Sequence, residues 1–186
     1  DERLEILTDQ IRTFQRLPWD YVAGAFTPTT PDGKDWFSAE ERAVVRLSSK
    51  SHWDVPVKLP NGSVLHVLCS HPTPPVFDGP ELRNKKRYHE EIRLWRDYIE
   101  KAPYVVDDRN EPNGLRRTDL FVIIGDLNAD PDEGDSFKNP IKTELLSCPR
   151  INTESVPFAD VDMAAQGLDP DDTSMFKLRV DYVLPA

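Results

Sequence analysis

The sequence is poor in the residues that would place it in several large protein classes. Its 186 residues include only two cysteines, too few for a zinc cluster or a disulfide framework, so the redox compartment stays open. Cys69 stands in an apolar run, where we expect a small buried residue, and Cys148 stands in a Ser-Cys-Pro turn. No stretch approaches the roughly 20 apolar residues of a membrane-spanning helix, and the first residues show no signal-peptide pattern.

Positive charge is scarce relative to negative charge. The 23 lysines and arginines stand against 33 acidic residues, which gives a formal net charge of −10. Phosphate contacts need many basic side chains, so this balance argues against a protein that holds nucleic acid on a broad basic surface. The balance is compatible with an enzyme that neutralises phosphate through a bound divalent cation. The length suits one domain, and 17 prolines indicate irregular loops rather than a helical bundle.

One stretch, residues 120–131, reads Leu-Phe-Val-Ile-Ile-Gly-Asp-Leu-Asn-Ala-Asp-Pro. Its leading apolar run, 120–124, predicts a strand buried on both faces, which ends at Gly125. Such a strand delivers Asp126 and Asn128 to the edge of a packed core, where sites commonly lie. The same residue types are common turn formers, so this stretch alone is equally compatible with a site and with a turn that has no further role.

A second polar residue follows a predicted hairpin. The run 53–59 partly alternates apolar and polar residues, and Asn61-Gly62, the strongest hairpin signal in the chain, leads into the apolar run 64–69. That run continues into a proline-rich loop, where Pro72 restricts His71 to extended backbone conformations. His71 is therefore held in a stiff loop, either as a functional group or as an ordinary surface histidine.

The remaining elements before the central stretch are one helical turn, one strand and one long helix. Ser38 and Glu41 have the spacing of a capping box, which predicts a short helical turn before a strand at 44–48. The clearest helix covers 80–101, with an apolar stripe on one face and dense charge on the others, as in a helix that is solvated on those faces. Arg83, near its start, could reach toward whatever the loop of His71 binds.

The end of the chain carries a third polar group. After a short helix expected at 141–146, residues 177–185 read as a strand with Asp181 in its middle. A carboxylate inside such a strand costs stability unless it is paired or used, so Asp181 needs a partner, and a histidine would serve.

Three strands thus deliver polar groups, and in a layered α/β architecture their ends would gather at one rim. His71, the pair Asp126 and Asn128, and Asp181 offer an imidazole, carboxylates and an amide. Together such groups can polarise a phosphate oxygen, orient an attacking water and hold Mg²⁺, which are the functions that phosphoryl transfer needs.

Three motifs in the same order resemble those of the endonuclease/exonuclease/phosphatase superfamily, which has the deoxyribonuclease-I-like fold. They are SHPTPP (70–75), GDLNADP (125–131) and LRVDYVLP (178–185). The stretch from 38 to 186, with SSKSHWDVPV (48–57) and FDGPELRNKKRYHEEI (77–92), is similar to a bacterial branch of that superfamily.

The resemblance implies an α/β fold, a four-layered sandwich of two packed mixed β-sheets with helices outside. It implies a metal-dependent hydrolase of phosphoester bonds, either a phosphodiesterase or nuclease or a phosphatase, that uses Mg²⁺ or Mn²⁺. His71 would bind the scissile phosphate, and Asp126 and Asn128 would orient or activate water and touch the metal. Asp181 would orient a second histidine. His52 lies in a region that borders the site in relatives, so it is a candidate substrate-binding residue. Arg83 is a second candidate, because it could reach toward whatever the loop of His71 binds.

The sequence also departs from the family pattern. Relatives have an Asn and a metal-binding Glu in earlier motifs, and a Ser-Asp-His motif after the strand of Asp181; neither is found here. All four histidines precede Asp126. We therefore expect residues 1–186 to be one incomplete domain, inactive alone. The alternative is a family member without catalysis that serves as a binding or scaffolding module.

The resemblance leaves the biological setting open. The substrate would be a nucleic acid, a phospholipid or a small phosphate ester, and the acidic charge lowers the odds of tight duplex binding. We expect a monomer without a membrane span, in a secreted or periplasmic location rather than a cytoplasmic one.

Overall fold

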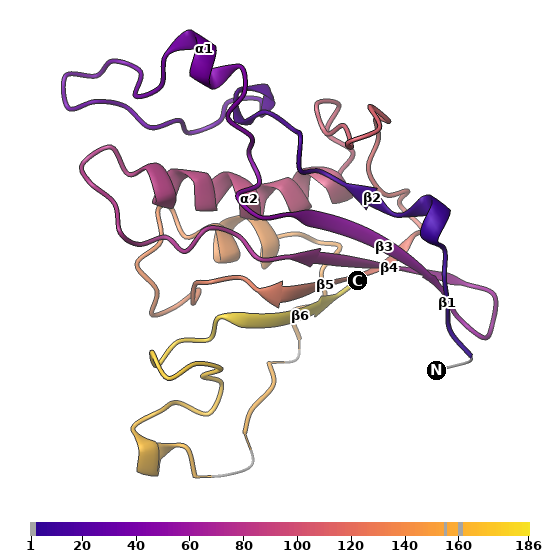
Figure 1. Ribbon diagram of the computed structural model, residues 1–186. Helices are drawn as coiled ribbons and strands as arrows, with labels where there is room; N and C mark the ends of the chain where they lie inside the picture. The colour runs from indigo at the N-terminus through magenta and orange to yellow at the C-terminus, as the bar shows by residue number, and fades with distance from the viewer. Residues whose placement is uncertain (1–2, 155, 160–161) are drawn as a thin grey trace.

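A single mixed β-sheet organises the chain in the computed structural model, which describes residues 3–154, 156–159 and 162–186 (Figure 1). Its six strands pair in the order β1-β3-β4-β5-β6, and β2 pairs with β3 on the same side as β1. The strands are β1 (Glu5–Ile6), β2 (Arg12–Thr13), β3 (His52–Lys58), β4 (Val64–Ser70), β5 (Leu120–Asp126) and β6 (Asp181–Pro185). The helices are α1 (Ala39–Arg42) and α2 (Arg83–Ile99), with short helical turns at Thr8–Gln10, Trp19–Tyr21, Ile141–Leu145 and Ala164–Gln166.

A hairpin and a helical crossover build the centre of the sheet. β3 and β4 pair antiparallel, and Gly62 in their turn has a φ of 84°, in the left-handed region that favours glycine. The chain then passes through α2 to β5, which pairs with β4 in parallel, as a connection through a helix allows. β6 pairs antiparallel with β5.

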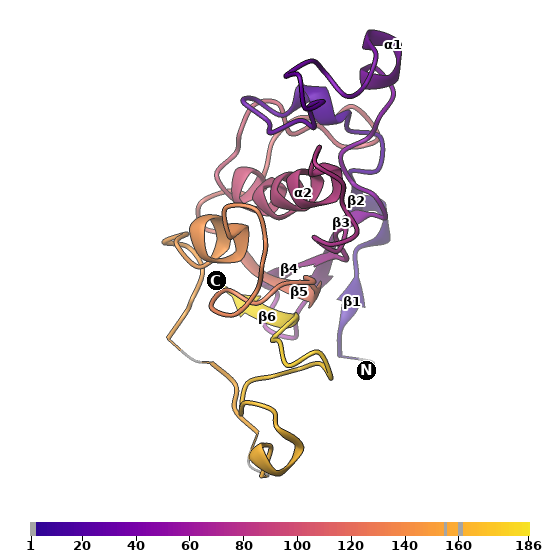
Figure 2. The same ribbon diagram turned by 90° about the vertical axis from the view of Figure 1, so that its left-hand side faces the viewer.

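α2 covers one face of this sheet (Figures 1 and 2). Tyr88, Ile92, Trp95 and Ile99 form its buried stripe at helical spacing. This stripe belongs to the same core as the side chains that the strands bury, which are Leu68, Phe121, Ile123, Tyr182 and Leu184. The segment that contains α1 lies on the side of α2 away from the sheet (Figure 1).

The opposite face of the sheet, which we call the open face, carries apolar side chains that stay partly exposed. One row across it consists of Trp53, Cys69, Ile124 and Val183, and the next consists of Val55, Val67 and Val122. Trp53 is 46% exposed and Val183 is 65% exposed. Because successive residues of a strand face opposite sides, Ile123 is buried under α2 while its neighbours in β5 lie on the open face.

The predicted hairpin, long helix, capping-box turn and central strand are confirmed, as is the mixed α/β class. Other expectations are wrong in detail. Residues 44–48 form no strand but a single bridge, Arg46 with Pro18, and the last strand begins only at Asp181. The short helix is one π-helical turn at Ile141–Leu145.

Of the two packed sheets that the resemblance implies, the described residues form one. Cys69 is half-buried on the open face rather than fully buried, and both cysteines are free. Among the described residues, no helix is long and apolar enough to cross a membrane.

Candidate functional site

The polar strand ends meet at one edge of the sheet. β4 and β5 run in parallel, so their last residues lie at the same edge, and the antiparallel β6 begins there. Asp126, the last residue of β5, lies opposite Asp181, the first of β6. His71 directly follows β4. The three groups that the sequence placed at strand ends are therefore brought together.

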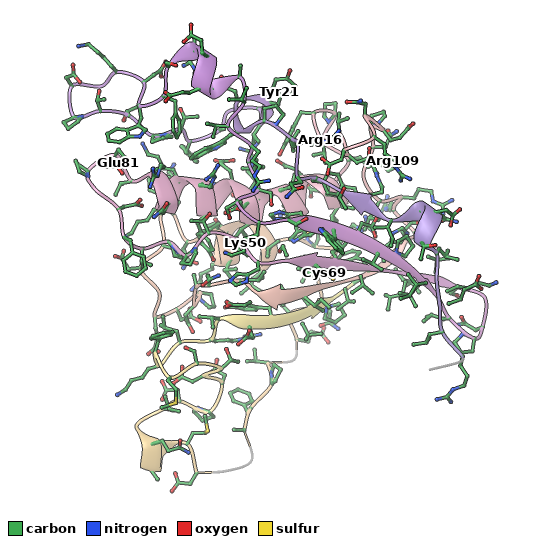
Figure 3. The ribbon with its side chains drawn as sticks, viewed as in Figure 1. Arg16, Tyr21, Lys50, Cys69, Glu81 and Arg109 are labelled. Atoms are coloured by element: carbon green, nitrogen blue, oxygen red, sulfur yellow. The ribbon has the colours of Figure 1, made fainter. Side chains whose placement is uncertain are left out.

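His71 and Asp126 approach each other at this edge. The His71 Nε2 atom lies 3.6 Å from Asp126 Oδ2, within ion-pair range but longer than a hydrogen bond. The side chains are 49% and 38% exposed, so a ligand can reach both. An adjoining cavity of about 370 Å³ on the side of the open face is lined by His71, Trp53, Cys69 and Lys50. Cys69 and Lys50, two residues of this lining, are labelled in Figure 3.

Asn128 holds the two loops of this edge together. Its side-chain Nδ2 donates to the carbonyl of Pro72 at 3.1 Å, and its backbone N–H donates to Asp126 Oδ1 at 3.0 Å. Its φ of 61° is left-handed, which asparagine tolerates better than most residues. The amide orientation leaves Asn128 Oδ1 without a partner among the described residues, so this oxygen is available to a cation or a water molecule.

Gly125 permits the close approach of β5 to β4. A Cβ atom at this position would lie 2.0 Å from the carbonyl oxygen of Ser70, and the φ of 153° is one that side chains rarely adopt. A larger residue would therefore push apart the two strands that carry His71 and Asp126.

Glu91, a residue of α2 that no sequence motif singled out, holds the loop of His71 in place through hydrogen bonds. This fully buried carboxylate of α2 accepts hydrogen bonds from the backbone N–H and hydroxyl of Ser49, at 2.6 and 2.8 Å, and from the N–H of Thr73 at 2.7 Å. The dense charge of this helix predicts solvated faces, but Glu90 and Glu91 are both buried. The sequence offered no sign of this, because α2 is densely charged throughout.

His52 lies in the core rather than at the exposed edge. Its Nε2 is 2.9 Å from the carbonyl of Glu91, which can only accept, so Nε2 carries the proton and Nδ1 accepts from the Ser48 hydroxyl at 2.9 Å. Burial lowers the pKa of His52 below its ordinary value, although the charge of Glu91 opposes this shift. With both ring nitrogens engaged and no exposed surface, His52 supports the Glu91 helix turn and does not reach a substrate.

Arg83 and Asp181 also differ in setting from the expectation. Arg83 is exposed in the first turn of α2, and no contact joins it to His71 or Asp126 in the described part of the chain. Asp78 caps that helix by accepting from the N–H groups of Asn84 and Lys85. Asp181 is exposed at the start of its strand, so its carboxylate needs no buried partner. Its backbone N–H donates to Thr173 Oγ1.

The residues at this edge can supply part of a cation site. Asp126 Oδ2 and Asn128 Oδ1 are two hard oxygen donors of the kind that Mg²⁺ and Mn²⁺ bind. Within residues 3–154, 156–159 and 162–186, no group of three or more His, Cys, Asp or Glu side chains could hold a metal ion. The donors fit a divalent cation chemically, but they form an incomplete set.

Residues 2–186 match the endonuclease/exonuclease/phosphatase family. The chain belongs to this family. Members of the endonuclease/exonuclease/phosphatase family are generally hydrolases of phosphoesters and bind divalent metals, and the motifs around His71, Asp126 and Asp181 are those on which the resemblance rested. No protein of curated function matches the sequence.

Several solved structures that match this chain span much more sequence than it does. An endonuclease/exonuclease/phosphatase from Beutenbergia cavernae is 17% identical with a TM-score of 0.51, and the match covers 98% of this chain and 38% of that one. The human nocturnin catalytic domain is 12% identical with a TM-score of 0.44, over 100% and 49% of the two chains. A beta toxin of Staphylococcus aureus with bound magnesium ions is 16% identical with a TM-score of 0.41, over 72% and 41%. The chain thus spans less than half of each of these structures, and the first of them shows a shared fold.

Proposed function

We propose that this chain carries part of the active site of a hydrolase that cleaves phosphoester bonds with Mg²⁺ or Mn²⁺. The observation that carries the proposal is the assembly of His71, Asp126 and Asn128 at one exposed edge, with Asp181 opposite Asp126. Family membership supports the reaction class at the coarse level of phosphoester hydrolysis.

Each residue has a role that its contacts support. His71 donates a hydrogen bond to a non-bridging phosphate oxygen. Its ring is half exposed at the edge, so a phosphate can reach it. Asp126 accepts a hydrogen bond from the attacking water and orients it toward phosphorus. Asn128 fixes the Asp126 carboxylate through its backbone N–H. Asp181 orients an acid–base histidine that this chain does not provide at that edge.

Asp126 and Asn128 would hold the divalent cation, which when bound neutralises charge on the phosphate and polarises water. Two oxygen donors are too few for the site, so the proposal requires at least one further carboxylate ligand that the described residues do not supply at this edge. For the same reason we expect residues 1–186 alone to be inactive.

The experiment uses the full-length protein that the gene encodes, with Mg²⁺ and with EDTA. Duplex DNA, bis-p-nitrophenyl phosphate, p-nitrophenyl phosphate and phospholipid vesicles would separate nuclease or diesterase, phosphatase and lipid phosphodiesterase activities. We expect His71→Ala and Asp126→Asn to lower kcat at least 100-fold. Asp132→Asn, which neutralises an exposed carboxylate of the same acidic loop, is the matched control and should leave kcat within about twofold. Full activity after both site substitutions would overturn the assignment.

A binding or scaffolding module without catalysis is the second candidate, and the incomplete set of cation donors favours it. The two candidates differ in a direct binding measurement on the full-length protein. Calorimetric titration with Mn²⁺ should detect binding that Asp126→Asn abolishes if the hydrolase proposal holds. No Mn²⁺ binding at millimolar concentration, together with no hydrolysis of any of the four substrates, would favour the binding module.

A further inference from the structure

A cavity lies at the end of the sheet opposite the proposed hydrolase site. It measures about 690 Å³, and its polar lining includes Arg12, Asp54, His66, Tyr98, Arg116 and Asp119. His66 precedes His71 by five residues of nearly continuous strand, so the two histidines are about 16 Å apart at about 3.3 Å per residue. Asp54, His66 and Tyr98 lie on the face of the sheet that α2 covers, so the cavity belongs to neither the open face nor the His71 edge.

A buried chain of polar groups forms one wall of this cavity. Asp54, which is 1% exposed, accepts from the Tyr98 hydroxyl at 2.5 Å and from His66 Nδ1 at 2.9 Å. Arg12 ion-pairs with Asp107 at 2.9 Å and also reaches the Tyr98 oxygen. Burial and the charge of Asp54 raise the pKa of Tyr98 well above its ordinary value, so Tyr98 remains a donor to Asp54.

This wall fixes what His66 can offer a ligand. The Asp54 carboxylate accepts, so His66 Nδ1 carries a proton and points its N–H at Asp54. The other nitrogen, Nε2, has no partner among the described residues. In the neutral ring Nε2 is an acceptor, and it would accept a hydrogen bond from a hydroxyl or amine of a molecule in the cavity.

Arg116 provides a second, complementary group. Its backbone N–H and its Nε donate to the two oxygens of Asp119, at 2.7 and 3.0 Å, which orients the guanidinium. Its two terminal nitrogens have no partner in the described part of the chain. A fork of this kind suits the oxygens of a phosphate or carboxylate. The acidic residues of the lining, Asp54 and Asp119, are already engaged, so the free groups there favour an anion over a cation.

We propose that this cavity binds a small hydroxylated anion of the sugar-phosphate class, with the anionic group on Arg116 and a hydroxyl donating to His66 Nε2. The volume is in the range of ordinary small-molecule sites. The site is separate from the hydrolase edge, so the proposal does not depend on the reaction assigned there.

The test is a calorimetric titration of the full-length protein with glucose 6-phosphate, glucose and inorganic phosphate. Asp126→Asn in EDTA serves as the background, so that metal-dependent turnover at the other edge does not contribute. We expect glucose 6-phosphate to bind at least tenfold more tightly than phosphate, and glucose to bind more weakly still. Arg116→Gln should weaken glucose 6-phosphate and phosphate at least tenfold each. Arg117→Gln, which removes the adjacent exposed arginine outside the lining, should change neither.

A second readout tests the contact with His66 without a substitution that could loosen Asp54. In nitrogen-15 spectra, glucose 6-phosphate should shift the His66 Nε2 resonance, whereas that of His71 should stay unchanged. Absence of binding at 10 mM, equal effects of Arg116→Gln and Arg117→Gln, or a shift at His71 instead of His66 would each overturn the proposal.

Discussion

Asp126 and Asp181 are directly opposite residues in the antiparallel ladder of β5 and β6. The Cβ atoms of such pairs are about 4.5–5.5 Å apart, and like charges there destabilise a sheet. In the described part of the chain, only His71 approaches the Asp126 carboxylate as a basic partner, and no basic side chain pairs with Asp181. The fold thus carries a local repulsion at the edge where the proposed site lies.

Neutralising one member of this pair should therefore stabilise the chain. We expect Asp181→Asn to raise the free energy of unfolding by about 0.5 kcal/mol in EDTA, measured by urea denaturation. Glu154→Gln, at an exposed carboxylate without an opposite acidic residue, controls for the general effect of a lower net charge. Equal gains from both substitutions would show that only the net charge matters.

Removing the Glu91 carboxylate should loosen the loop that carries His71. Glu91→Ala leaves the N–H groups of Ser49 and Thr73 without their buried acceptor, which should cost about 3 kcal/mol of unfolding free energy. Hydrogen exchange at the Thr73 amide should accelerate more than exchange in β5. Glu100→Ala, at the exposed C-cap residue of α2, is the control and should cost less than about 1 kcal/mol. A loss of stability at Glu91 as small as that at Glu100 would contradict the role of Glu91 as the buried acceptor that holds the loop of His71.

The buried neutral state of His52 makes stability depend on pH. Burial holds the folded-state pKa of His52 below the ordinary 6.5, so below about pH 6.5 only the unfolded chain takes up a proton there. The free energy of unfolding should therefore fall as the pH falls from about 6.5, by up to about 1.4 kcal/mol per pH unit, until the folded-state pKa is reached. Urea denaturation between pH 5 and 8 should show this fall in unfolding free energy in the wild type and not in His52→Gln. His71→Gln, at an exposed histidine, should keep it.

The sequence allowed prediction of the elements whose signals are local. Asn61-Gly62 predicted the hairpin, the apolar run at 120–124 predicted β5, and the proline-rich loop placed His71 after a strand. Asp126 and Asn128 were found because a polar pair follows an apolar strand. The layered α/β architecture predicted that the strand ends gather at one rim, and the parallel pairing of β4 with β5 is what brings His71 to Asp126.

The roles of buried charges could not be predicted, because burial depends on tertiary packing. Glu91 and Arg83 lie on the same densely charged helix, yet one is fully buried under the loop of His71 and the other is exposed. Likewise, nothing local separates His52, which is engaged in the core, from His66, which lines a cavity. The strand expected at 44–48 failed because it gained only one bridge, and a strand needs a continuous partner.

Adjacent residues of β5 should differ sharply in their contribution to stability. Ile123 is buried under α2, whereas Val122 lies on the open face beside Val55 and Val67. We expect Ile123→Ala to cost about 3 kcal/mol of unfolding free energy, because it leaves a cavity in the core, and Val122→Ala to cost less than about 1 kcal/mol. Val122→Lys should leave the far-ultraviolet spectrum unchanged and reduce the binding of an apolar dye, whereas Ile123→Lys should unfold the chain. Equal losses at the two positions would show that the open face is covered in solution.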